Sequence, residues 1–148
     1  MNDATPASRS VIVEREMPFP PEKVWRALTR GPLLEEWLMA NDFEPVVGHR
    51  FHFRAPATPY WNGVTACEVL TVEPHTRLAY SWAATGADAA GGPKTVVTWT
   101  LEPTPRGVLV RMEQSGFGAD QERNIQGATY GWRKFVDQLA GVVERDEG

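Results

Sequence analysis

Apolar side chains recur every three or four residues near the end of the chain, and this spacing predicts an amphipathic helix over about residues 120–143. The apolar face of this helix is formed by Ile125, Ala128, Trp132, Phe135, Val136, Leu139, Val142 and Val143. Gly127, Gly131 and Gly141 interrupt the segment, although a glycine in a helix interior costs about 1 kcal/mol relative to alanine. Gly131 lies at the edge of the apolar face, so its role depends on what lies against the helix.

Most of the remaining chain alternates between apolar and polar positions, which is typical of strands. These segments cover residues 9–17, 48–55, 63–74, 76–84, 95–103 and 107–115. Residues 18–29 and 30–38 have helical spacing, and prolines stand at the start of each. Because short turns join the later strands, the sheet should be antiparallel. We therefore expect an α+β fold in which a curved antiparallel β-sheet wraps around a long C-terminal α-helix, with two short helices after the first strand.

The length of 148 residues fits one domain, and no internal repeat is visible. We expect a single domain over residues 9–144 and flexible termini at residues 1–8 and 145–148. The net charge of −4 and the lack of a basic stripe argue against a nucleic-acid partner. The polar start does not read as a secretory signal, and no apolar run approaches the ~18 residues of a membrane span. A cytoplasmic protein without a membrane partner is the expectation.

Four sequence motifs, taken in order, resemble one known superfamily. They are "FPPEKVWRALTRGPLLEEWL", "GHRFHF", "EVLTVEPHTRLAYSW", and "SGFG" followed at a distance by "GWRKFVDQL". Together they cover roughly residues 11–143 and resemble the START-like superfamily with the helix-grip fold, also called SRPBCC. Within it, the chain is most similar to the branch named for the C-terminal domain of activators of the heat-shock protein 90 ATPase.

This resemblance implies a hydrophobic pocket between the sheet and the long helix. Members of the superfamily bind lipids or polyketides, catalyse cyclisation or hydrolysis, or bind protein partners, so the fold alone does not determine the function. The eponymous activators also carry an additional N-terminal domain that engages the chaperone. Here the chain begins almost directly with the first strand, so activation of the chaperone is not expected.

Aromatic residues on facing elements are the main candidates for lining such a pocket. They are Phe51, Phe53, Tyr80, Trp82, Trp99, Trp132 and Phe135, and Tyr80 and Gln114 add hydrogen-bonding groups. The alternative is that these side chains simply pack a core. Gly131, and with it Gly127, would leave room for a ligand at the mouth of the cavity. The alternative there is that the helix packs closely on a strand or a tryptophan, or bends.

The strand over residues 63–74 allows two orientations. In the first, Glu68 faces the cavity with Val64 and Ala66, where loss of solvent would raise its pKa and allow acid–base chemistry. In the second, Cys67 and Val69 face inward and Glu68 faces water. Both remain open at this point.

Motifs for other chemistry are missing. His49 and His52 would point to opposite faces of a strand, so no metal site is expected. Cys67 is the only cysteine, and neither a Gly-x-Ser-x-Gly elbow nor a phosphate-binding glycine loop occurs. The glycine-rich residues 86–92 form a loop that could act as a lid. No cofactor is expected.

The sequence is compatible with three functions. The first is non-catalytic binding of a small hydrophobic molecule. The second is a protein-interaction module, with a chaperone or a second copy of the chain as partner, and an exposed Trp25 or Tyr60-Trp61 would favour it. The third is a cyclase- or hydrolase-like enzyme that uses Glu68, Tyr80 or a histidine.

Overall fold

The computed structural model of the chain describes residues 9–57, 63–84, 94–118 and 122–146. Its strands are β1 (Arg9–Met17), β2 (Ala40–Asn41), β3 (Arg50–Arg54), β4 (Val64–Glu73), β5 (Arg77–Ala84), β6 (Lys94–Thr104) and β7 (Gly107–Phe117). Its helices are α1 (Pro21–Thr29), α2 (Gly31–Trp37) and α3 (Glu122–Arg145). The predicted α+β arrangement is confirmed, with the short strand β2 added and α3 ending slightly later than expected.

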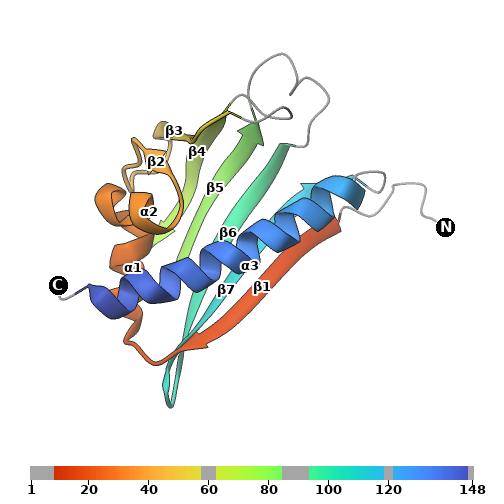
Figure 1. The fold of residues 1–148 in the computed structure, drawn as a ribbon. Helices are drawn as coiled ribbons and strands as arrows, with labels where there is room; N and C mark the ends of the chain where they lie inside the picture. The colour runs from red at the N-terminus through yellow and green to blue at the C-terminus, as the bar shows by residue number, and fades with distance from the viewer. Residues whose placement is uncertain (1–8, 58–62, 85–93, 119–121, 147–148) are drawn as a thin grey trace.

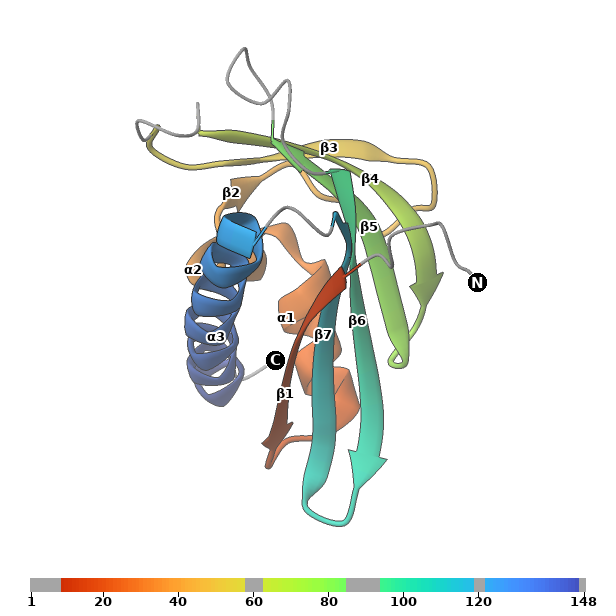
Figure 2. The same ribbon diagram turned by 90° about the vertical axis from the view of Figure 1, so that its right-hand side faces the viewer.

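All seven strands form one antiparallel sheet in the order β1-β7-β6-β5-β4-β3-β2. Neighbours in the sheet are mostly neighbours in sequence, which is the pattern that short turns produce. The exception is β1, which pairs with β7 and thereby joins the first strand of the sequence to the last. The sheet curves strongly, and β1 and β3 lie on opposite sides of its concave face (Figure 2).

Helix α3 lies across the concave face of the sheet (Figure 1). Its buried residues are Ile125, Trp132, Val136, Leu139, Val142 and Val143, while Ala128 and Phe135 are partly buried and pack against the same core. The helix therefore places its apolar face toward the sheet, as the spacing predicted. The long helix and the curved sheet bury one another, so the core of the protein lies between them.

Helices α1 and α2 cover one end of the concave face of the sheet. Pro20 is extended before α1, and Pro21 begins the helix, where a missing N–H has no cost. The buried Trp37 of α2 donates its indole N–H to the carbonyl oxygen of Ala27 at 2.8 Å. Its ring meets Trp99 edge-on, with centroids 5.5 Å apart. The two short helices thus contribute a wall to the core.

Candidate ligand site in the aromatic interior

The strand register decides which side chains face α3. Residues paired across neighbouring strands share a face of the sheet. Phe51 pairs with Cys67, and all three of Phe51, Cys67 and the neighbouring Val69 are buried. Val69 in turn pairs with Tyr80, which pairs with Val97. This pairing determines which side chains of β3, β4, β5 and β6 lie on the inner face of the sheet.

The seven aromatic residues predicted to line a pocket form one contiguous cluster. On the sheet, Phe51 contacts Tyr80 at 5.6 Å between ring centroids, and Phe53 contacts Trp82 at 5.4 Å. From the sheet to α3, Trp82 lies 5.2 Å from Trp132, and Trp99 lies 5.8 Å from the same ring. Phe135 completes the cluster 5.7 Å from Trp132. Most contacts are tilted or edge-on, the arrangement that aromatic quadrupoles favour.

Phe43 belongs to the same cluster, although the sequence did not indicate it. Its ring meets Phe51 edge-on at 5.0 Å and Tyr80 at 6.3 Å. Phe43 lies in the irregular segment between β2 and β3, where no periodic pattern distinguishes inward from outward positions. Only the tertiary structure brings it to the inner face.

A chain of buried hydrogen bonds ties α3 to the sheet. Trp132 donates its indole N–H to Gln114 Oε1 at 2.7 Å, and Gln114 Nε2 donates to Thr95 Oγ1 at 2.8 Å. Thr95 Oγ1 donates in turn to the carbonyl oxygen of Trp82 at 3.2 Å. Gln114 is only 4% exposed, so these bonds satisfy polar groups that cannot reach bulk water. The sequence predicted Gln114 but not Thr95, although Thr95 alternates in register with Val97.

Tyr80 is the most deeply buried polar side chain of the predicted set. Its hydroxyl oxygen accepts a hydrogen bond from Trp99 Nε1 at 3.0 Å. Burial raises the pKa of the Tyr80 phenol well above its ordinary value, and the bond from Trp99 opposes this effect only in part. Burial, assisted by the negative charge of Asp42, also raises the pKa of the Cys67 thiol. Both groups therefore stay protonated at neutral pH.

Of the two orientations that the sequence allowed for β4, the one in which Glu68 faces the cavity is wrong. Glu68 pairs across the sheet with Arg50, whose side chain is 85% exposed, and the two form an ion pair at 3.6 Å. Cys67 and Val69 occupy the buried positions on either side of it. The carboxylate therefore lies on the outer face of the sheet, in the second of the two orientations that the sequence allowed.

Gly131 and Gly127 border open space. A Cβ atom built at either position would meet no atom within 4 Å outside its own part of the helix. Close packing on a strand or a tryptophan is therefore not the reason for either glycine. Gly131 is half-buried and lies one helical turn before Phe135, whereas Gly127 is exposed. Only Gly131 thus lies at the border between the aromatic cluster and solvent.

The histidines do not form a site. His49 hydrogen-bonds the backbone oxygen of Asp42 at 2.9 Å, and His52 lies 4.0 Å from the Asp42 carboxylate. Within the described ranges, no group of three or more His, Cys, Asp or Glu side chains could hold a metal ion. The predicted loop over residues 86–92 and the pair Tyr60-Trp61 lie outside the described residues.

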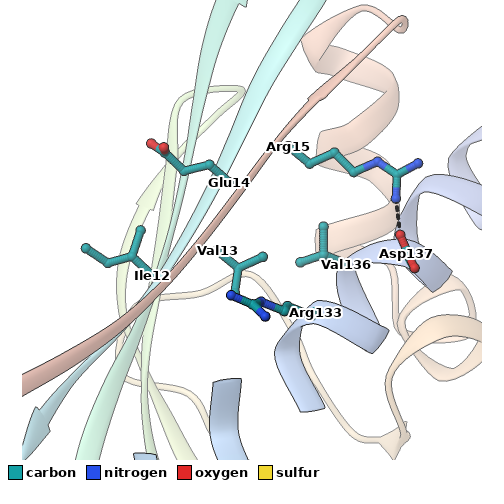
Figure 3. A pocket seen from close by; sticks show the side chains of 7 residues that line it. All are labelled: Ile12, Val13, Glu14, Arg15, Arg133, Val136 and Asp137. Carbon is teal, nitrogen blue, oxygen red and sulfur yellow. Dashed lines mark hydrogen bonds and ion pairs between the residues drawn. The ribbon is translucent and has the colours of Figure 1, made fainter. Parts of the chain in front are cut away.

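A groove of about 340 Å³ lies on the other side of α3, along the edge strand β1 (Figure 3). Its lining consists of Ile12, Val13, Glu14, Arg15, Arg133, Val136 and Asp137. The guanidinium of Arg15 forms an ion pair with Asp137 across the groove. None of the clustered aromatic residues lines it, so the groove is separate from the aromatic interior.

The curved antiparallel sheet, the long helix across it and the aromatic interior between them define a START-like, or SRPBCC, helix-grip protein. A comparison with protein families makes this specific. The chain belongs to the family described as Activator of Hsp90 ATPase homolog 1-like protein, whose profile matches residues 18–144. The resemblance inferred from the sequence motifs is thereby confirmed.

Solved structures share the fold. Protein MLL2253 from Mesorhizobium loti is 51% identical, with a TM-score of 0.85 over 95% of this chain and 100% of that chain. The Aha1 dimer from Colwellia psychrerythraea is 20% identical, with a TM-score of 0.76 over 95% of this chain and 99% of that chain. DynU16, from the dynemicin biosynthetic locus, is 24% identical, with a TM-score of 0.76 over 92% of this chain and 47% of that chain. The last two show similarity of fold alone.

No curated protein matches the chain. None of the helices in the described part of the chain is both long enough and apolar enough to span a membrane.

Proposed function

We propose that this protein is a cytoplasmic, non-catalytic binding protein for a small hydrophobic molecule, which it holds between the sheet and α3. The observation that carries the proposal is the shape of the aromatic cluster. It runs from fully buried rings to the half-buried Trp82 and Phe135, next to the open space at Gly131. Aromatic walls with few polar groups are typical of sites for apolar ligands.

The chemistry of the inner face supports binding rather than catalysis. General acid–base catalysis at neutral pH requires a group with a pKa near 7. Among the described residues that face the interior, the titratable groups of the cluster are Tyr80 and Cys67, and burial raises the pKa of both. Glu68, the carboxylate considered for this role, lies on the outer face. A cyclase- or hydrolase-like activity therefore has less support.

Ligand binding can be tested with the uncharged fluorescent probe N-phenylnaphthylamine and two matched variants. In Gly131→Leu, the new side chain fills the half-buried border of the cluster, so we expect affinity for the probe to fall at least about tenfold, equivalent to about 1.4 kcal/mol. In Gly127→Leu, the same side chain enters exposed space one turn earlier, and affinity should stay unchanged. Circular dichroism checks that both variants fold.

Two results would contradict the proposal. One is the absence of probe binding by the wild type together with the absence of any retained molecule in native mass spectrometry of protein from its producing cells. The other is an equal effect of the two leucine substitutions, which would place the probe elsewhere on the molecule.

A second candidate function is contact with another protein, either a second copy of the chain or a chaperone. Val46, Val47 and Leu70 are exposed, and a hydrogen bond from Gly48 N to Val69 O at 2.8 Å brings their segments together. Trp25 gives this candidate no support, because it is buried with its ring 6.1 Å from that of His75. Light scattering of the wild type and Val47→Asp would test self-association: a dimer lost in the variant supports it, and a wild-type monomer opposes it.

A further inference from the structure

The two edges of the sheet are not protected in the same way. One edge is β2, which has only two residues, and α2 packs against it. The side-chain amide of Asn41 in β2 donates to the carbonyl oxygen of Gly31 in α2 at 3.1 Å. The other edge is β1, which has nine residues and pairs only with β7 among the described strands. A long edge strand is a template for pairing with another chain unless it is covered or carries charge.

The backbone of β1 offers hydrogen-bonding groups on the side away from β7. In an antiparallel pair, every second residue directs its N–H and C=O groups outward instead of toward the partner strand. From Val11 to Arg15, none of these outward groups hydrogen-bonds another group in the described part of the chain. They are therefore available to an added strand, whose own backbone supplies the matching donors and acceptors.

The first half of β1 carries no charge that would oppose such pairing. Residues 11–13 are valine, isoleucine and valine, and Ile12 is 48% exposed. Charged side chains usually protect an open edge. The next charge along the strand belongs to Glu14, whose carboxylate is paired with Arg111 of β7, with Oε2 and Nε 3.5 Å apart. The open stretch of the edge is therefore apolar.

The groove between β1 and α3 lies beside this apolar stretch (Figure 3). Val13 and Val136 give its lining an apolar part, and the ion pair of Arg15 with Asp137 neutralises two of its charges. Arg133 extends from α3 toward β1, and its exposed guanidinium forms no ion pair or hydrogen bond within the described chain. A guanidinium binds a carboxylate well, because its fork of N–H groups matches two oxygen atoms. The groove thus offers one unmatched positive charge.

We propose that this groove binds an extended acidic segment of another protein, which adds to β1 as a strand and pairs a carboxylate with Arg133. Strand addition places every second side chain of the segment toward the groove. The expected pattern is therefore a glutamate or aspartate and, two positions away, an apolar residue that packs on Val13 and Val136. The groove is separate from the aromatic interior, so the proposal does not depend on ligand binding there.

A second copy of the chain fits the same edge less well. An antiparallel pair of two β1 strands keeps the inner faces of both sheets on the same side. On the groove side, the second copy would therefore present Val11, Val13 and Arg15, which pair with buried residues of β7. It would bring a cation and no carboxylate to Arg133. Charge complementarity thus favours an acidic segment of a different protein.

The first test measures the contribution of the carboxylate. The probe is the peptide GTETVTVTG with an N-terminal fluorescein and a C-terminal amide, in which the glutamate and both valines share one face. Fluorescence anisotropy compares its affinity with that of GTQTVTVTG. For the wild type we expect the glutamate peptide to bind about threefold more tightly, as an exposed ion pair allows. This preference should disappear in Arg133→Gln and persist in Lys134→Gln, whose exposed side chain on α3 does not line the groove.

The second test asks whether the peptide binds as a strand. Two versions of the glutamate peptide each carry one backbone N-methyl group, at neighbouring residues near the centre. Neighbouring residues of an extended strand direct their N–H groups to opposite sides, so only one of the two methyl groups would face β1. We expect that version to bind at least about tenfold more weakly and the other to bind like the parent peptide.

The proposal would be overturned if the glutamate peptide did not bind at millimolar protein concentration, or if both N-methylated versions bound equally. An equal effect of Arg133→Gln and Lys134→Gln on the preference for glutamate would also overturn it. Light scattering tests the other occupant: a wild-type dimer that excludes the peptide would assign the edge to a second copy of the chain. None of these outcomes affects the test with N-phenylnaphthylamine, so failure here is distinguishable from failure of the proposed function.

Discussion

Replacement of Gln114 by leucine tests how α3 is held against the sheet. The substitution keeps a side chain of similar size but removes the acceptor of Trp132 and the donor to Thr95. Thr95 retains its bond to the Trp82 carbonyl, so the main loss falls on the indole N–H of Trp132, which is only 3% exposed. A buried donor left without a partner costs about 1–3 kcal/mol. We therefore expect Gln114→Leu to lower the free energy of unfolding by about 2 kcal/mol.

A double-mutant cycle with Trp132→Phe isolates this hydrogen bond from packing. Phenylalanine lacks the N–H, so the second substitution removes the group that Gln114→Leu leaves unpaired. In the presence of Trp132→Phe, the cost of Gln114→Leu should therefore shrink by at least about 1 kcal/mol. Gln138→Leu, at an exposed position on α3, should change stability by less than about 0.5 kcal/mol.

The assay is urea denaturation followed by far-ultraviolet circular dichroism, because the signal must not depend on the substituted tryptophan. For a protein of this size, 1 kcal/mol corresponds to about 2–4 °C in Tm, so Gln114→Leu should melt about 4–8 °C below the wild type. Independent effects add within about 0.3–0.5 kcal/mol. If the stability effects of Gln114→Leu and Trp132→Phe were additive within this range, the hydrogen bond would contribute nothing measurable to stability. The account of how α3 is attached to the sheet would then be refuted.

Three further predictions concern the edges of α3. Gly131→Ala should stabilise the protein by about 0.5–1 kcal/mol in urea denaturation, because alanine favours the helix and its Cβ meets open space; destabilisation would contradict that geometry. Asp137→Asn should lower the free energy of unfolding by less than about 1 kcal/mol, since the ion pair of Asp137 with Arg15 is exposed. A larger loss of stability would contradict this expectation. The hydrogen bond and charge of Arg9 lower the pKa of Glu122. The stability difference between wild type and Glu122→Gln should therefore be present at neutral pH and vanish as the pH falls through that lowered pKa. A stability difference that does not change with pH would contradict a stabilising role of this ion pair.

The periodicity of apolar residues was sufficient to predict most of the fold. Alternation identified the strands from β3 to β7, and 3–4 spacing identified α3, because each of these elements has one clearly apolar face. The aromatic set followed from the same patterns, since alternate residues such as Tyr80 and Trp82 must share a face. Strand β2 was missed, because a two-residue strand is too short to show a period.

Glu68 shows where periodicity fails. The two faces of β4 both carry small or apolar residues: Val64, Ala66 and Leu70 on one, Cys67 and Val69 on the other. A bulge between Val69 and Thr71 then shifts the pairing with β5, so the alternation does not continue through the strand. Pairing with β3, which depends on residues distant in sequence, decides the orientation. The choice could not be made from β4 alone.

The attachment of α3 is asymmetric, and for the ligand proposed above this asymmetry favours entry from one side. Toward β1 the helix is held by the ion pairs Arg9–Glu122 and Arg15–Asp137, and toward β7 by the bond between Trp132 and Gln114. On the opposite edge, the described residues of α3 meet β5 through the aromatic contact between Trp82 and Trp132, and only the C-terminal end of the helix adds an ion pair there, from Arg145 to Glu36 of α2.

Ring contacts can separate without leaving polar groups unpaired, whereas separation from β1 or β7 would break ion pairs or expose a buried indole N–H. A small outward movement of this edge would therefore cost least where Trp82, Phe135 and the open space at Gly131 lie together. Because the open space at Gly131 lies on the same edge, the proposed ligand would enter there without breaking the polar attachments of the helix to β1 and β7.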